Sequence, residues 1–314
     1  MKIVFLGTPD FAVASLKALV ENDFDVVGVV TMPDKKSGRG MKLQQSAVKK
    51  YAVKEGICVL QPTNLKEDSF QEELRALKPD LQIIVAFRML PQSVWQLPKY
   101  GTFNLHGSLL PNYRGAAPIN WAVINGEKET GVTTFFLEHD IDTGEIIDSA
   151  KIKIGINETA GEVHDRLMIV GADLVIKTTR KILKGSVSTQ KQDDILKGQK
   201  PKLARKIFKE SCRIDWSQKS YKVHNHIRGL SPYPTAFSTL RFSDGKEVVF
   251  KIFKGEQNDD VLNSGAIKTD GKTKLFIGCG DGSFEIYELQ LAGKKRMLVK
   301  SFLQGVNLEG ATIV

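Results

Sequence analysis

The sequence of 314 residues contains few cysteines, and the three that are present, Cys58, Cys212 and Cys279, lie far apart. An odd number of widely spaced cysteines argues against a disulfide framework and is typical of proteins in a reducing cytoplasm. The sequence also lacks any run of the roughly eighteen apolar residues that a membrane helix needs. Its first apolar run covers only residues 3–6 and stops at Gly7, so we expect no secretory signal.

Three site motifs are missing as well. Residues 7–12, Gly-Thr-Pro-Asp-Phe-Ala, lack the G-x-G-x-x-G pattern, and Pro9 and Phe11 would crowd a pyrophosphate, which argues against a nicotinamide-dependent dehydrogenase. No serine or cysteine is flanked by a nucleophile-elbow pattern, so direct attack on an acyl donor is favoured over an acyl-enzyme. His224 and His226 lack cysteine or acidic neighbours at ligand spacing, so we predict no metal site.

The basic residues are distributed unevenly along the chain. Residues 1–196 carry 24 Lys and Arg against 24 Asp and Glu, whereas residues 197–314 carry 21 against 12, so the net charge of +9 lies in the C-terminal part. No apolar amphipathic stripe accompanies this charge, which favours nucleic acid over a membrane as the partner. Taken alone, the charge fits a lysine-rich surface that only keeps the protein in solution as well as it fits a surface that binds nucleic acid.

The N-terminal part alternates between apolar, strand-like runs and amphipathic, helix-like runs. The expected strands are residues 3–6, 26–31, 81–87, 101–106 and 130–137, and the expected helices are residues 11–21, 46–55 and 159–184. This alternation predicts an α/β fold with a Rossmann-like, doubly wound parallel sheet.

A polar, lysine-rich stretch that contains Pro201 covers residues 191–205, and we predict a linker there. It would join a catalytic domain at 1–190 to a second domain at 206–314. Five short β-type runs follow it, at residues 235–242, 247–253, 265–268, 274–278 and 284–291. They predict a small C-terminal β-barrel, for which the five-stranded oligonucleotide-binding (OB) barrel is one candidate.

An amide, an imidazole and a carboxylate form the candidate catalytic set. Asn104 and His106 stand at i and i+2 on an expected strand, so both side chains point to the same face at the strand end. Acyl transfer to an amine needs donors for an oxyanion and a group that handles the amine proton. Asn104 and His106 suit the first need, and Asp142 would orient the imidazole or accept the proton. Taken singly, His106 fits a structural histidine better, and Asp142 an ordinary turn former.

A second candidate feature is the glycine-containing basic loop at residues 33–42, with Lys35, Lys36, Arg39 and Lys42. Cations beside glycines make an arm that could follow a phosphate backbone. A solvated surface loop is the simpler interpretation of this segment alone, and the basic C-terminal part shifts the balance towards nucleic acid.

These motifs closely resemble the methionyl-tRNA formyltransferases, a family of folate-dependent formyltransferases, over nearly the whole chain. The resemblance is carried by residues 5–12, 33–42, 104–119, 142–144, 213–216, 232–234 and 292–295. The Asn, His and Asp set is shared by folate-dependent formyltransferases generally. The Gly-Thr-Pro-Asp-Phe start, the basic loop and the C-terminal part point to the members that act on tRNA.

The resemblance implies a site, a donor and a partner. It implies that Asn104, His106 and Asp142 are catalytic, that 10-formyltetrahydrofolate is a co-substrate rather than a permanent cofactor, and that initiator methionyl-tRNA is the acceptor of a monomeric enzyme. Residues that the family uses for folate fall on Ser108, Leu109, Leu110, Pro111, Phe87, Met89 and Leu90, and its arginine for the acceptor stem falls on Arg39. We expect Lys35, Lys36 and Lys42 of the same basic loop to contact the tRNA as well. A formyltransferase acting on a small amine, such as glycinamide ribonucleotide, is the alternative function.

The chain departs from the family pattern at one place. Residues 86–91, Ala-Phe-Arg-Met-Leu-Pro, are one residue shorter than the Ala-Tyr-Gly-Leu-Ile-Leu-Pro of bacterial members and carry Arg88 near the position of its glycine. This departure concerns the pterin contacts and not the catalytic set.

Overall fold

The computed structural model describes residues 1–37 and 41–314, so the predicted tRNA contact Arg39 lies outside the described residues. The chain divides into two compact units. The first unit comprises Met1–Gly115, Thr130–Ile152 and His164–Leu203, and the second comprises Ala116–Glu129, Lys153–Val163 and Ala204–Val314. Among the described residues, no helix is both long enough and apolar enough to cross a bilayer.

The first unit is built on a seven-stranded sheet, in the order β10-β9-β7-β6-β1-β2-β5. The strands are β1 (Ile3–Gly7), β2 (Val26–Val30), β5 (Val59–Leu60), β6 (Leu81–Val85), β7 (Thr102–His106), β9 (Glu129–Phe136) and β10 (Ile146–Lys153). The neighbouring pairs β5–β2, β2–β1, β1–β6 and β6–β7 run parallel, whereas β7 and β9 are antiparallel. This confirms the predicted Rossmann-like fold.

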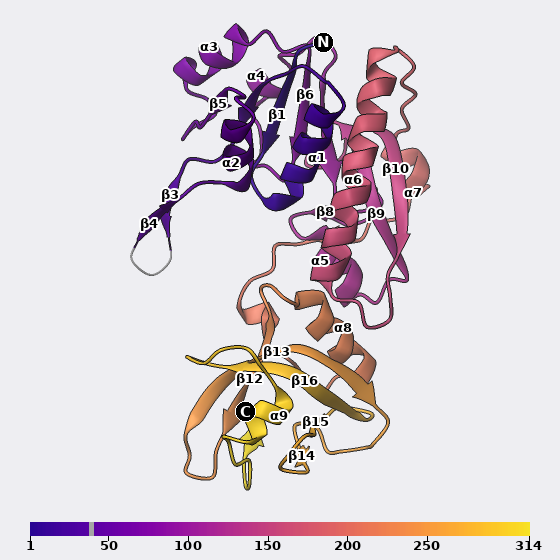
Figure 1. Ribbon diagram of the computed structural model, residues 1–314. Helices are drawn as coiled ribbons and strands as arrows, with labels where there is room; N and C mark the ends of the chain where they lie inside the picture. The colour runs from indigo at the N-terminus through magenta and orange to yellow at the C-terminus, as the bar shows by residue number, and fades with distance from the viewer. Residues whose placement is uncertain (38–40) are drawn as a thin grey trace. The chain divides into compact units, whose positions relative to one another are not determined.

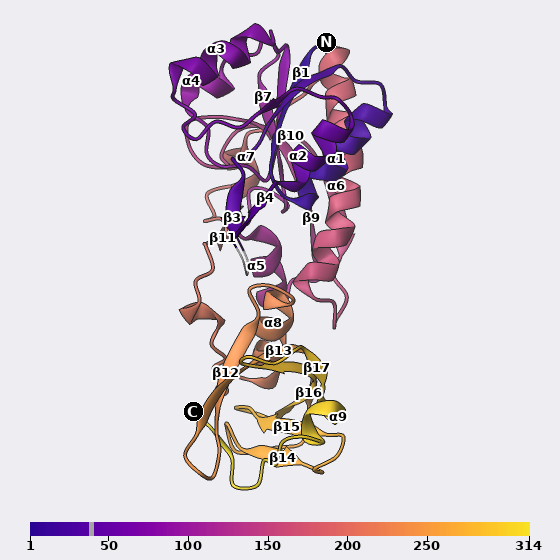
Figure 2. The same ribbon diagram turned by 60° about the vertical axis from the view of Figure 1, so that its left-hand side comes forward.

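Helices cover both faces of this sheet because its central strands are apolar on both faces. Every residue of β1 and β6 is buried. Figure 2 shows α1 (Asp10–Glu21), α2 (Ala47–Lys54) and α6 (Ala160–Leu183) on one side, and α3 (Asp68–Ala76) and α4 (Gln92–Trp95) on the other. Phe70 and Leu74 of α3 pack with Val4 and Leu6 of β1, and strand alternation directs Phe5 to the opposite face.

Shorter elements of the first unit surround the C-terminal edge of the parallel strands. They are a hairpin of β3 (Lys35–Ser37) and β4 (Lys42–Gln44), which Figure 1 shows extending from the sheet, together with β8 (Arg114–Gly115) and α7 (Gln192–Leu196). The stretch at 191–205, where we predict the linker, contains α7 and β11 (Leu203–Ala204), and the two units divide within it, between Leu203 and Ala204. Gln192 is only 2% exposed, so the polar composition there reflects a buried amide as well as solvent-facing lysines.

The second unit contains a barrel-like antiparallel sheet in the order β14-β15-β16-β13-β12-β18, with β17 paired to β16. The strands are β12 (Ala236–Arg241), β13 (Glu247–Asn258), β14 (Ile267–Thr269), β15 (Leu275–Gly278), β16 (Ser283–Leu291), β17 (Met297–Leu298) and β18 (Thr312–Ile313). All five predicted strands are present, and two short ones were missed. Phe250, Phe284 and Phe302 fill the core with Trp216.

Helices that the sequence did not predict complete this unit. They are α5 (Pro118–Ile124), α8 (Ser220–Leu230), α9 (Val299–Leu303) and the 3₁₀ turn η1 (Glu210–Cys212). α5 and α8 pack closely, since a Cβ at Gly229 would lie 2.8 Å from the backbone nitrogen of Ile124. The histidines His224 and His226 belong to α8 and are thus part of the core-facing helix.

Candidate active site

Strand β7 carries two of the three predicted catalytic side chains to its C-terminal end. β7 lies between β6 and β9, and Asn104 pairs with Ile84 on one side and Phe135 on the other. The strand therefore gives both side chains a rigid base, and its alternation places Asn104 and His106 on the same face as predicted. Asn104 is half-buried, and in the described part of the chain its carboxamide makes no hydrogen bond. The amide is thus available to a ligand.

His106 is held by a backbone carbonyl. Its Nε2 lies 2.8 Å from the carbonyl oxygen of Tyr113, and because a carbonyl only accepts, Nε2 carries the proton. Its Nδ1 lies 3.8 Å from Oδ2 of Asp142, which is longer than a hydrogen bond. The edge of the ring is packed against Phe135 at a centroid separation of 6.4 Å. The Tyr113 carbonyl therefore orients the imidazole, and the Asp142 carboxylate lies beside Nδ1 without a direct hydrogen bond to it.

The loop that follows β7 is braced by hydroxyl groups. Ser108 Oγ donates to the Asn112 carbonyl at 2.7 Å, and Thr133 Oγ1 donates to the Ser108 carbonyl at 2.7 Å. The Leu110 amide donates back to Thr133 Oγ1. Of the four predicted folate-loop residues, Ser108, Leu110 and Pro111 are buried and Leu109 is half-buried, so their side chains shape the loop from within.

Asp142 occupies a strained turn whose conformation is fixed by neighbouring groups. Its φ is +56°, in the left-handed region that non-glycine residues rarely adopt. Its Oδ2 accepts a hydrogen bond from the Gly115 amide at 2.9 Å, and its carbonyl accepts one from Nε2 of Gln192 at 2.9 Å. The turn ends at Gly144, where a Cβ would lie 1.7 Å from the Phe136 carbonyl oxygen. The carboxylate is therefore held beside His106 at a defined position.

The predicted pterin segment is divided between core and surface. Leu90 is a member of the apolar cluster on the α3 side of the sheet, and Phe87 packs against that cluster. Met89, by contrast, is 72% exposed. Arg88 donates to the carbonyls of Pro62 and Thr63, so its guanidinium ties this segment to the loop after β5. Arg88 thus has a structural partner at the point where the sequence departs from the family.

The two ends of the basic loop pair as strands β3 and β4, and polar side chains fix the base of this pair. Lys49 donates to Asp34 at 2.6 Å, and Gln61 donates to the other oxygen of the same carboxylate at 2.8 Å. These two donors hold the pKa of Asp34 below its usual value. Lys35 is exposed, and the backbones of Lys36 and Lys42 belong to the two strands, whereas their side chains lie outside the description.

The arrangement also contains residues that the sequence did not indicate. Tyr113 acts on His106 through its backbone carbonyl, and Thr133 lies on β9, so neither side chain is marked by a motif. The sequence marks Arg114 only as part of the Arg-Gly motif, and Gln192 falls in the predicted linker. A buried glutamine in a polar stretch gives no pattern that distinguishes it from an exposed one.

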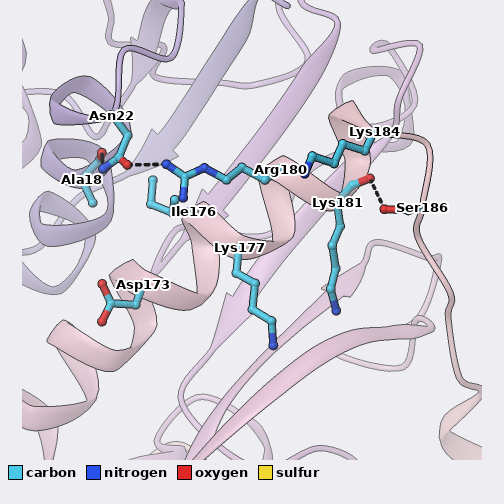
Figure 3. Close-up of a pocket in the computed structure, with 9 residues that line it drawn as sticks. All are labelled: Ala18, Asn22, Asp173, Ile176, Lys177, Arg180, Lys181, Lys184 and Ser186. Atoms are coloured by element: carbon cyan, nitrogen blue, oxygen red, sulfur yellow. Dashed lines mark hydrogen bonds between the residues drawn. The ribbon is translucent and has the colours of Figure 1, made fainter.

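A groove elsewhere on the first unit is cationic but its charges diverge. Figure 3 shows Arg180 of α6 directed to Asn22, whose Oδ1 it contacts at 2.7 Å. Lys177 and Lys181 extend to the other side, where both pair with Asp148 on β10 at 2.9 and 2.7 Å. Because these cations are aimed at separate partners, the groove does not assemble an anion site.

Two family models match the chain, and its relatives match over nearly its full length. The formyl transferase model matches residues 1–179, and the model of the formyl transferase C-terminal domain matches residues 206–307. The methionyl-tRNA formyltransferase of Bacteroides fragilis is 52% identical over 313 residues, covering 99% of this chain and 97% of that protein. The methionyl-tRNA formyltransferase of Flavobacterium johnsoniae is 49% identical over 307 residues, covering 98% and 96%.

Solved structures share the fold at lower identity. An N-formyltransferase from Helicobacter canadensis, in complex with folinic acid and dTDP-3-aminofucose, matches with a TM-score of 0.66 at 23% identity, covering 95% of this chain and 100% of that one. HypX from Aquifex aeolicus, in complex with tetrahydrofolic acid, matches with a TM-score of 0.65 at 19% identity, covering 98% and 48%. The two matching family models and the full-length relatives place this chain in the formyl transferase family.

Proposed function

We propose that this chain transfers the formyl group of 10-formyltetrahydrofolate to the α-amino group of methionine on initiator methionyl-tRNA. The observation that carries the chemistry is the meeting of His106 and Asp142 at 3.8 Å at the end of the strand that also presents Asn104. The acceptor is supported by relatives that are about half identical over nearly the full chain and are described as methionyl-tRNA formyltransferases. The folate binds as a co-substrate that leaves after each turnover.

The three side chains divide the reaction between them. As the amine attacks the formyl carbon, the Asn104 amide donates to the developing oxyanion. The Nδ1 of His106 is the ring atom that faces the site, because Nε2 is bound to the Tyr113 carbonyl. Protonated there, His106 stabilises the oxyanion and then gives its proton to the departing N10 of the folate. Asp142 stabilises the imidazolium and takes the amine proton, through water where needed.

The basic C-terminal part is the proposed tRNA-holding module. Residues 197–314 carry the whole net charge of +9, and the residues after 204 form the antiparallel sheet of the second unit. Lys35, Lys36, Arg39 and Lys42 on the β3–β4 segment are proposed to contact the acceptor end of the same tRNA. We further propose that the enzyme acts as a monomer in the cytoplasm, where its acceptor is charged.

A transfer assay tests donor, acceptor and reaction together. Formyl-labelled 10-formyltetrahydrofolate is incubated with charged initiator methionyl-tRNA, with uncharged tRNA and with glycinamide ribonucleotide. Label on the charged tRNA alone is the expected result. Label on the small amine alone would retain the site but replace the acceptor by the alternative one, and the absence of label from all three would reject formyl transfer.

Replacement of His106 tests the central proton donor. His106→Ala should lower kcat by at least about a hundredfold, because it removes both a donor to the oxyanion and the proton for the leaving nitrogen. His164→Ala is the matched control, since His164 is partly exposed and its contacts, with Asp165 and the ring of Phe11, lie outside the proposed catalytic set. Near-normal turnover of His106→Ala would show that the assignment is wrong.

A further inference from the structure

Gln192 is a buried amide whose donor and acceptor ends are both engaged by the candidate active site. It lies on α7, only 2% exposed. Its Nε2 donates to the carbonyls of Asp142 and Gly144 at 2.9 and 2.8 Å, and its Oε1 accepts from Nε of Arg114 at 2.9 Å. One side chain thus connects α7 to the Asp142 turn and to β8.

The two donated bonds hold the turn that carries Asp142. The carbonyls of residues i and i+2 converge on a single nitrogen, which requires the bend that a left-handed φ of +56° at Asp142 provides. A non-glycine residue keeps this left-handed backbone conformation only when the surrounding structure fixes it. Gln192 supplies that fixation, because it binds the main chain on both sides of Thr143.

The hydrogen bond that Gln192 accepts from Arg114 also affects the Asp142 carboxylate. Arg114 is bound to Gln192, and the next residue, Gly115, donates its amide to Oδ2 of Asp142. Oδ2 is also the oxygen that lies 3.8 Å from Nδ1 of His106. Gln192 therefore fixes both the backbone of Asp142 and the donor that aims its carboxylate.

We propose that Gln192 is a positioning residue that sets Asp142 against His106 for formyl transfer. This inference rests on the catalytic role proposed for Asp142. Gln192 itself is only 2% exposed and has no donor left for substrate, because both protons of its Nε2 are donated to carbonyls inside the network and its Oε1 accepts from Arg114. Its effect on turnover must therefore pass through Asp142.

The first test compares Gln192→Leu and Gln192→Glu with wild-type enzyme. Gln192→Leu removes all three bonds, whereas Gln192→Glu keeps an acceptor for Arg114 and loses both donors. We expect kcat to fall by about 10- to 100-fold in Gln192→Leu, by analogy with the loss found when a hydrogen-bond partner of a metal ligand is removed. We expect the KM for both substrates to change by less than about threefold. Asp194→Asn, an exposed position on the same helix, is the control and should match wild type.

A double-variant experiment separates positioning from a purely structural role. If Gln192 acts through Asp142, Gln192→Leu should lower kcat by less than about threefold in an Asp142→Asn background, because the group it positions has already lost its charge. The pH profile of kcat should also shift in Gln192→Leu, since the Asp142–His106 spacing changes. The inference would fail if the kcat reductions of the two single variants multiplied in the double variant and the pH profile of kcat did not shift. Gln192 would then only support the fold.

The same set of variants distinguishes failure of the inference from failure of the proposed site. If Asp142→Asn lowers kcat strongly while Gln192→Leu retains wild-type kcat, the inference is wrong and the site stands. If Asp142→Asn retains wild-type kcat, the proposed role of Asp142 is wrong and the inference falls with it. Should Gln192→Leu not fold, Arg114→Met removes one bond of the same network from a half-buried position and should still lower kcat with little effect on either KM.

Discussion

At the scale of single residues, the site depends on which polar atoms are already engaged and which are left for substrate. His106 uses Nε2 for the Tyr113 carbonyl and keeps Nδ1 for the reaction. Asp142 uses Oδ2 for the Gly115 amide, whereas Asn104 has no hydrogen bond among the described residues. An amide with an unused donor beside a strand end is what an oxyanion requires, because preorganised donors stabilise developing charge without reorganising.

The first prediction at this scale concerns the oxyanion donor. Asn104→Ala should lower kcat by about a hundred- to a thousandfold, with a small change in the KM for folate, because the lost bond strengthens only in the transition state. Steady-state transfer kinetics measure both constants. Asn307→Ala, at an exposed position, is the matched control. A loss confined to KM would show that Asn104 binds substrate without stabilising the oxyanion.

At the scale of elements, the sequence predicts the strands and helices with strong periodicity and misses those whose signal is tertiary. β1, α1, β6, β7 and α6 were expected within one or two residues, because their apolar runs are buried on one or both faces. α7 and α8 were missed because polar side chains such as Gln192 and Arg228 are buried there on hydrogen-bond partners. Arg228 donates to the Glu158 carbonyl, and hydrophobic periodicity does not report such a bond.

The prediction at this scale concerns the base of the β3–β4 hairpin. Asp34→Asn removes the charge that pairs with Lys49 at 2.6 Å, although Gln61 can still donate to the remaining oxygen. We expect faster amide exchange in β3 and a several-fold rise in the KM for tRNA, with the KM for folate unchanged. Asp68→Asn on α3 is the control. Equal changes in both KM values would show that the pair supports the folate site rather than the hairpin.

At the scale of the whole molecule, the sheet unit carries the catalytic set, and both units are basic: the first holds 25 Lys and Arg against 20 Asp and Glu, and the second 20 against 16. The proposed acceptor is a polyanion, so its binding should depend on ionic strength, whereas folate binding should depend on it much less. The second unit also carries a buried histidine, His224, and a half-buried one, His226, in α8, and the lowered pKa of each couples its stability to pH.

The salt prediction follows from counterion release. Raising monovalent salt from about 50 to 200 mM should weaken binding of charged tRNA by tenfold or more, because each phosphate that is neutralised releases condensed cations. Filter binding measures this, and the KM for folate over the same range is the internal control. A tRNA affinity that does not respond to salt would contradict the proposed role of the basic part.

The pH prediction concerns His224, which is 4% exposed and packs near Phe284. Burial, aided by the nearby Arg228 charge, lowers the pKa of His224 to about 4. The unfolded chain, with an ordinary histidine pKa of about 6.5, binds this proton more readily, so stability is full above pH 6.5 and declines as the pH falls towards 4. The loss for this group should approach about 3 kcal/mol, and the lowered pKa of His226 acts in the same direction.

Urea unfolding followed by tryptophan fluorescence, to which Trp216 in the core of the second unit contributes, measures this loss. His224→Gln should be less stable at pH 7 yet lose less stability between pH 6.5 and 4. His164→Gln, at a partly exposed position, should keep the wild-type dependence. If the stability of His224→Gln depended on pH as the wild-type stability does, the buried imidazole would not be the acid-sensitive group.

The sequence by itself determined the α/β sheet, the five main strands of the second unit, and the placement of Asn104 and His106 on one face of β7. Each of these follows from local periodicity, which the chain carries in consecutive residues. Only the tertiary structure decided that the Tyr113 carbonyl orients His106, that Arg88 binds the loop after β5, and that Gln192 fixes the Asp142 turn. These contacts join polar groups that are far apart in the chain or involve main-chain atoms. Such hydrogen bonds form where folding brings the partners together, and no periodic pattern in the sequence predicts them.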